Sequence, residues 1–181
     1  MILETKRLLL RQWREDDAED LYKFASDERI AVPLGIVAHK SVDFSREVIR
    51  GPLCGEEEYA VCRKEDDRAV GCVELLLGDD REIKEGERDG EISYWIGVDY
   101  WGQGLIPEAV EALARHAFAD LSLDRLWCGY FDGNEKSKRV MEKCGFSYRY
   151  TKKDFLWRIT GEIKTEHVFC LERAEWEQKR G

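Results

Sequence analysis

The chain has 181 residues, of which 43% are hydrophobic, and this length and composition fit one folded domain and exclude an intrinsically disordered protein. Its formal net charge of −9 argues against a nucleic acid as the main ligand. No apolar run approaches the roughly 20 residues of a membrane span, and the first residues lack the pattern of a signal peptide, so we expect a cytoplasmic protein that contacts neither nucleic acid nor membrane.

In the first half of the chain, the hydrophobic pattern predicts a strand, two helices and a pair of hairpin strands. These elements are expected at 7–14, 16–26, 41–50, 58–63 and 69–77. Pro33 and Gly35 break the pattern between the two helices. The charged segment 79–91 is expected to be a solvated loop.

The second half continues with strands and helices in alternation. They are expected at 91–98, 105–119, 125–131, 134–144, 147–153 and 165–172. The whole pattern predicts a single mixed α/β domain, residues 1–181, built around one sheet.

A glycine turn, Tyr100 to Ala109, leads from a predicted strand into a predicted helix. Gly102 and Gly104 let the backbone approach a ligand, because no Cβ intervenes. The free N–H groups at the start of a helix favour an anion, so the turn predicts a pyrophosphate site. On this motif alone, a purely steric role for the glycines is equally open. Gly97, inside the preceding strand, indicates either a bulge or a close approach by a ligand.

The cysteines form no CxxC pair and the histidines lie far apart, so no metal site is expected. Cysteines within strand-like runs should be small buried side chains. They stand at positions 62, 72, 128 and 170.

Four motifs together resemble the GNAT N-acetyltransferase family, and within it the RimJ/RimL-like group that acetylates ribosomal-protein N-termini. In chain order they are Glu4 to Arg11 with Asp16-Asp17, Glu91 to Ile96, Tyr100 to Gly104, and Asn134 to Ser137 with Glu142 to Phe146. The resemblance covers nearly the whole chain. It implies the GNAT fold, a mostly antiparallel sheet with a splayed central strand and helices on both faces.

The resemblance also implies that acetyl-CoA is the cosubstrate, without a metal, and that a primary amine takes the acetyl group by direct attack. The residues it places at the coenzyme are Ile96, Gly97, Val98, Trp101, Gly102, Gln103, Gly104, Leu105, Ile106, Asn134 and Ser137. Trp101 stands where most of the superfamily has Gln or Arg, although tryptophan is usual in this subgroup.

Two further positions depart from the family pattern. Ile106 stands where Gly or Ala is usual, so its branched side chain must find room beside the phosphates. Met141 stands where many relatives carry a tyrosine that acts as general acid. The cations Lys136, Lys138 and Arg139 either meet the 3′-phosphate of the coenzyme or form a solvated helix face.

Two acid–base roles are predicted. The amine must be neutral to attack, so a carboxylate helps remove its proton, directly or through water. Glu91 is the first candidate base and Glu74 the second, and the alternative for Glu91 is an exposed acid that closes the charged loop. Ser137 is the candidate acid for the departing thiolate, and its alternative is a serine that only caps its own helix. Asn134 is the expected N-cap.

The acceptor is not identified by the sequence. Seven acids between residues 15 and 28 suggest a negative wall that attracts a basic N-terminal peptide or a polyamine, while acids that only solubilise a helix are the alternative. The oligomeric state is open, and a homodimer is compatible with the sequence. A rival function, a non-catalytic acyl-CoA-binding regulatory module, fits the same glycine turn.

Overall fold

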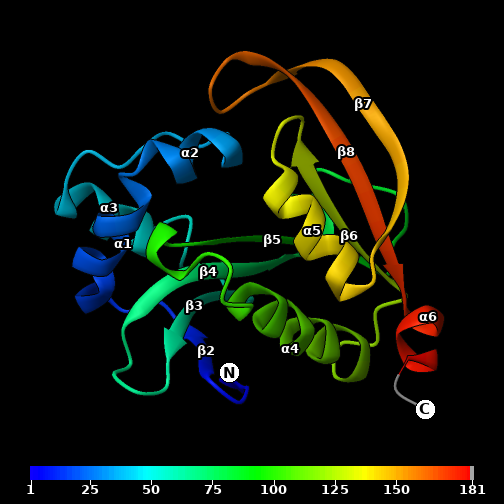
Figure 1. The fold of residues 1–181 in the computed structure, drawn as a ribbon, viewed down its shortest axis with the longest axis horizontal. Coiled ribbons are helices and arrows are strands. Elements are labelled where there is room, and N and C mark those ends of the chain that lie inside the picture. The colour runs from blue at the N-terminus through cyan, green and yellow to red at the C-terminus, as the bar shows by residue number, and fades with distance from the viewer. Residues whose placement is uncertain (180–181) are drawn as a thin grey trace.

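A computed structural model describes residues 1–179 and contains one sheet of eight strands in the order β1-β2-β3-β4-β5-β6-β8-β7 (Figure 1). Neighbouring strands are antiparallel, except that β5 and β6 are parallel. The expected single, mixed and mostly antiparallel sheet is therefore confirmed.

The strands follow the predicted order. They are β1 (Leu3–Glu4), β2 (Leu8–Gln12), β3 (Glu58–Arg63), β4 (Ala69–Leu76), β5 (Asp89–Ile96), β6 (Arg125–Phe131), β7 (Ser147–Trp157) and β8 (Glu162–Glu172). The sequence did not predict β1, because two residues carry no periodicity. The last two strands are longer than expected and form a hairpin that turns at Thr160 and Gly161.

The helices include two that the sequence did not predict, α2 and α6. The α-helices are α1 (Ala18–Ala25), α2 (Glu28–Leu34), α3 (Val42–Arg50), α4 (Leu105–Ala119), α5 (Glu135–Cys144) and α6 (Arg173–Gln178). The pattern does break at Pro33 and Gly35, but the break marks the end of α2 and not a loop between two predicted helices. Asp27 caps the start of this helix by accepting from Arg29 N at 2.9 Å, and Gly35 ends it at a φ of +67°.

Helices cover both faces of the sheet. On one face, α4 and α5 pack onto the main core, with Leu113 and Met141 among its buried side chains. On the other face, α1 and α3 bury Leu21 and Ile49 against β3 and β4. The predicted strand cysteines are buried, which confirms their structural role; these are Cys62, Cys72, Cys128 and Cys170.

The central strands β5 and β6 pair only at their beginnings. The register joins Asp89, Gly90 and Glu91 to Arg125, Leu126 and Trp127. Beyond these residues the two strands separate (Figure 1), which is the splay that the family resemblance implies. We call the separated parts, residues 92–96 and 128–131, the fork.

The predicted negative wall is largely neutralised. Four of its acids form ion pairs with arginines; the pairs are Glu15–Arg50, Asp17–Arg11, Asp20–Arg68 and Asp27–Arg29. Asp16, Glu19 and Glu28 are exposed. Several of these acids therefore stabilise the position of the first helices. The number of acids alone overstates the negative electrostatic potential that a cationic acceptor would meet.

Candidate active site

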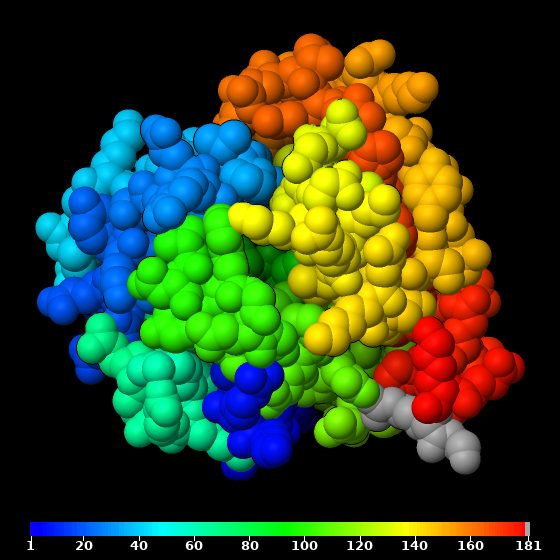
Figure 2. All heavy atoms as spheres, viewed as in Figure 1, coloured from blue at the N-terminus to red at the C-terminus, as the bar shows by residue number. Residues whose placement is uncertain are grey.

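One edge of the β5 backbone is directed into the fork. Gly97 N donates to Val70 O at 2.8 Å, and Ile96 is the register partner of Gly71. Because backbone groups along a strand point alternately to its two sides, the N–H groups of Tyr94 and Ile96 face away from β4. Figure 2 shows a recess between α5 (yellow) and the segment that leads into α4 (green). An extended ligand that enters the fork can pair with β5 as an added strand.

Gly97 has a packing role. A Cβ at this position would lie 2.5 Å from a ring atom of Phe24, which belongs to α1. Close packing against this ring is therefore a sufficient reason for a glycine here, and no ligand is needed to explain it. Its N–H is bonded to β4 and is not available as a donor. Ile96, Gly97 and Val98 were predicted to lie at the coenzyme. In the β4–β5 register, the N–H of Ile96 points into the fork.

The glycine turn presents backbone donors at the start of α4. Gly102 and Gly104 have φ values of +75° and +72°, which a residue with a side chain rarely adopts. The bond from Glu108 N to Gly104 O, at 3.4 Å, begins the helical ladder. The N–H groups from Gly102 to Ile106 precede this ladder and can bind an anion.

Side chains on either side hold the turn in shape. The Trp101 indole N–H donates to Ile96 O at 3.1 Å, and Gln103 Nε2 donates to Asp99 O at 3.0 Å. Arg7 Nη1 donates to Gln103 O at 3.0 Å. Trp101 and Gln103 therefore shape the turn with their side chains.

The expected crowding at Ile106 does not occur. The side chains of Leu105 and Ile106 are each 6% exposed and lie in the main core. The branched side chain thus lies in the core, and Ile106 contributes its backbone to the turn.

The first turn of α5 faces the fork. Asn134 Oδ1 accepts from Ser137 N at 3.3 Å, which confirms Asn134 as the N-cap. The Ser137 hydroxyl does not serve as the cap, since its Oγ lies 2.9 Å from the phenol oxygen of Tyr94. Tyr94 is a site residue that the sequence did not reveal. Strand alternation places it on the Ile92 and Ile96 face, but spacing along the chain gives no distance to α5.

The cations of α5 behave differently from one another. Lys136 Nζ lies 3.2 Å from the ring centroid of Trp101, so it connects α5 to the glycine turn across the opening of the fork. Lys138 lies 3.9 Å from Glu135, and Arg139 is exposed. A contact of any of them with a 3′-phosphate stays a prediction.

Glu91 lies at the closed end of the fork and is 8% exposed, so the alternative of an exposed acid is wrong. Its Oε2 accepts from the backbone N–H groups of Glu82 and Ile83, each at 2.8 Å. Burial raises the pKa of Glu91, and the N–H group of Ile83 partly opposes this rise. The carboxylate thus anchors the charged loop to β5.

Glu74 lies opposite Glu58 on β3 and Ser93 on β5. The three side chains form a row on the sheet face opposite Tyr94, because successive side chains of a strand alternate between faces. Burial raises the pKa of Glu74, and hydrogen bonds from Ser93 and Cys72 act against this rise. Burial, followed by the Glu74 charge, raises the pKa of Glu58 to about 7. Of the two carboxyl groups, Glu58 therefore titrates near neutral pH.

This raised pKa predicts a pH dependence of stability. Between the ordinary pKa of 4.5 and about 7, Glu58 binds more protons in the folded than in the unfolded chain. The free energy of unfolding should therefore fall as pH rises through this window. Urea titrations of Glu58→Gln should show a flatter slope there, whereas Glu56→Gln, an exposed neighbour, should keep the parent slope. An unchanged slope in Glu58→Gln would contradict the raised pKa.

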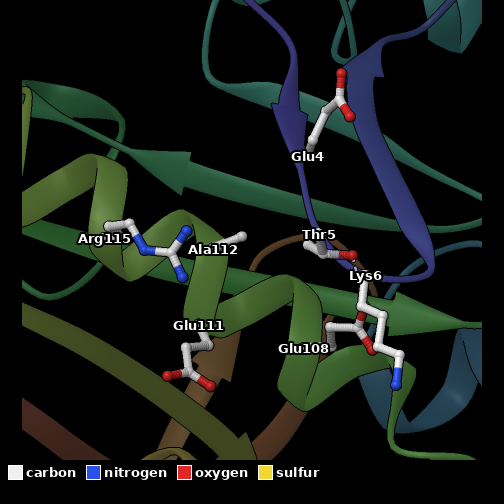
Figure 3. A pocket seen from close by; sticks show the side chains of 7 residues that line it. All are labelled: Glu4, Thr5, Lys6, Glu108, Glu111, Ala112 and Arg115. Carbon is white, nitrogen blue, oxygen red and sulfur yellow. Dashed lines mark hydrogen bonds between the residues drawn. The ribbon is translucent and has the colours of Figure 1, made fainter. Parts of the chain in front are cut away.

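A separate hollow of about 330 Å³ lies between the N-terminal segment and α4 (Figure 3). Glu108 Oε1 accepts from Thr5 Oγ1 at 2.6 Å and from Arg7 N at 2.8 Å, so it fastens this segment to the helix beside the glycine turn.

Within residues 1–179, no group of acidic, histidine or cysteine side chains is arranged to hold a metal ion. No helix in that range is long and apolar enough to cross a membrane.

Residues 7–147 match the acetyltransferase (GNAT) domain family. The chain belongs to the GNAT acetyltransferase family. It is thus an acyltransferase, and the resemblance based on four sequence motifs is confirmed.

Two similar proteins from Bacillus subtilis (strain 168) are also named as N-acetyltransferases. The uncharacterized N-acetyltransferase YoaA is 25% identical over 162 residues, which cover 87% of this chain and 89% of YoaA. YdaF, named as a candidate ribosomal N-acetyltransferase, is 34% identical over 98 residues, which cover 54% of this chain and 53% of YdaF. YoaA supports the N-acetyltransferase family, and the name of YdaF supports the subgroup suggested by the motifs.

The fold is shared with solved structures. A GNAT-family acetyltransferase from Bacillus anthracis superposes with a TM-score of 0.83, covering 97% of this chain and 100% of that chain. Its sequence identity is 21%, so this likeness concerns the fold alone.

Proposed function

We propose that this protein transfers the acetyl group of acetyl-CoA to a primary amine. The observation that carries the proposal is the fork, which joins the anion-binding turn from Gly102 to Ile106 to the Tyr94–Ser137 pair. The turn binds the pyrophosphate, and the free edge of β5 pairs with the pantetheine arm. Asn134 and Ser137 contact this arm from α5.

The two faces of β5 separate the acid from the base. Tyr94 brings Ser137 to one side of the fork, whereas Ser93 brings Glu74 to the other side one residue earlier. The amine approaches from the Glu74 side, where the carboxylate accepts its proton. The Ile96 N–H donates to the developing oxyanion. Ser137 then supplies a proton to the thiolate that leaves toward α5.

The acceptor is proposed to be a protein N-terminus, with a basic peptide or a polyamine as further candidates. The name of YdaF supports a ribosomal acceptor, since it describes a ribosomal N-acetyltransferase. An N-terminal amine also has a pKa near 7.7–8.0, compared with about 10.4 for lysine, so more of it is neutral at pH 7. A panel of N-terminal peptides, polyamines and amino acids, read by mass spectrometry of the acetylated product, tests this order.

The glycine turn yields a direct prediction. A side chain at Gly104 would place its Cβ 3.7 Å from Lys143 Nζ and 3.8 Å from Arg7 Nη2, in the space between two cations that a phosphate would occupy. Gly104→Val should weaken acetyl-CoA binding by about tenfold or more in calorimetry, because charged hydrogen bonds are lost.

The matched control is Gly161→Val. Gly161 has a φ of +73°, close to the +72° of Gly104, and no atom within 4 Å of an added Cβ, so it carries the same backbone strain far from the turn. Thermal melting measures that strain in both variants. Equal acetyl-CoA affinity in the two variants would show that the pyrophosphate binds elsewhere.

A further inference from the structure

Tyr94 connects β5 to α5 across the fork. Its phenol oxygen lies 2.9 Å from Ser137 Oγ and 3.1 Å from Ser137 O. Glu91 is the last β5 residue that pairs with β6, so Tyr94 lies on the separated part of the strand. Burial raises the pKa of Tyr94 well above its ordinary value, and the phenol therefore keeps its proton under the conditions of an acetylation assay.

Ser137 is held by its backbone and its side chain. Its N–H donates to Asn134 Oδ1 at 3.3 Å, and its carbonyl and hydroxyl oxygens both contact Tyr94. Since Asn134 caps the helix, the Ser137 hydroxyl is not needed for capping. Its contact with a second side chain indicates a role in the fork.

Cys128 is a further hydrogen-bond partner of the Tyr94 phenol, and two arrangements join the phenol to Ser137. A phenol carries one proton, and a carbonyl oxygen can only accept. When Tyr94 donates to Ser137 O, the phenol oxygen accepts the serine proton, which then points away from a ligand. When Tyr94 donates to Ser137 Oγ, the serine proton is free to point into the fork. Rotation of the Tyr94 and Ser137 hydroxyl groups about their C–O bonds exchanges the two arrangements.

We propose that Tyr94 is a positioning residue that donates to Ser137 Oγ and thereby directs the serine proton at the sulfur of the departing thiolate. This inference rests on the proposed function. The C–S bond of the tetrahedral intermediate breaks, the sulfur keeps the electron pair and takes the Ser137 proton, and Ser137 regains a proton from water. The amine proton leaves through the base on the opposite face. Met141, where the family's tyrosine would stand, lies in the core and cannot donate.

The first test compares rates and affinities. Tyr94→Phe should lower the single-turnover rate constant by about 10–100-fold and leave the dissociation constant of acetyl-CoA nearly unchanged, because one hydrogen bond to a developing charge is lost. The double variant with Ser137→Ala should be no slower than Ser137→Ala alone, since the two residues act as a unit. Tyr148→Phe is the control, because that exposed hydroxyl contacts Thr151 at 2.9 Å.

The second test separates proton delivery from structural support. With the selenoester of the coenzyme as donor, the leaving selenolate is a weaker base and needs less help from an acid. The deficit of Tyr94→Phe should then nearly disappear, as should that of Ser137→Ala, which removes the same contact from the other side. An unchanged rate, an additive double variant or an equal deficit with both donors would overturn the inference. A parent protein that acetylates no amine would instead contradict the proposed function itself.

Discussion

Replacing Glu74 by glutamine should lower the single-turnover rate constant of acetyl transfer by about 10²–10⁴-fold, the usual contribution of a general base. Glu74 lies beside Ser93, on the face of β5 opposite Tyr94, and burial raises its pKa. The charge of Glu74, after burial, raises the pKa of its register partner Glu58. A raised pKa makes the Glu74 carboxylate a better proton acceptor than an exposed glutamate. Rapid-quench measurements with saturating acetyl-CoA report this step without product release.

The matched comparison is Glu91→Gln. Glu91 is also buried with a raised pKa, but its Oε2 is occupied by two backbone N–H groups, and a glutamine oxygen can still accept them. We therefore expect Glu91→Gln to retain activity within about tenfold of the parent. A large loss in Glu91→Gln with little loss in Glu74→Gln would return the role of base to Glu91.

The largest effect on stability should come from Asp17. Its carboxylate accepts from Arg11 Nη1 and Nη2 at 2.7 and 2.8 Å and from Arg14 N at 2.8 Å. Arg11 and Asp17 are 4% and 6% exposed. Asp17→Ala would leave a buried guanidinium without its main partner, which costs about 3–5 kcal/mol of unfolding free energy. This is a large part of the roughly 5–15 kcal/mol of a typical domain.

Urea denaturation at pH 7 measures this loss. The control is Glu15→Ala, since Glu15 and Arg50 form an exposed ion pair that salt and water screen. Its denaturation midpoint should stay close to that of the parent. A similar midpoint for Asp17→Ala would show that the buried pair does not hold the first helix to β2.

Long periodic elements and turn chemistry made much of this fold predictable from sequence. The helix at 105–119, the strand at 125–131 and the N-cap at Asn134 all appear where the pattern places them. The helix α2 was missed because Pro33 lies inside this seven-residue helix, and a proline beyond the first turn normally breaks a helix.

The site was less predictable, because its contacts join residues that are distant in sequence. Helical spacing places Ile106 on the apolar face with Ala109, Val110 and Leu113, and its burial confirms that placement. Spacing does not show that Phe24 occupies the space beside Gly97. The contact between Tyr94 and Ser137 depends on how far β5 and β6 separate, and periodicity carries no information on that separation. Motifs thus pointed to the glycine turn as the candidate coenzyme site, whereas the proposed acid–base groups required the three-dimensional structure.

The most direct measurement of the central claim is the release of the free coenzyme thiol from acetyl-CoA by the purified protein, followed with a thiol reagent with and without an added amine. The account predicts that release depends on the amine, saturates with both substrates and matches the acetylated product one to one. It also predicts loss of this release in Glu74→Gln with retained acetyl-CoA binding. Binding of acetyl-CoA without amine-dependent thiol release, across N-terminal peptides, polyamines and amino acids, would contradict the account and indicate an acyl-CoA-binding module.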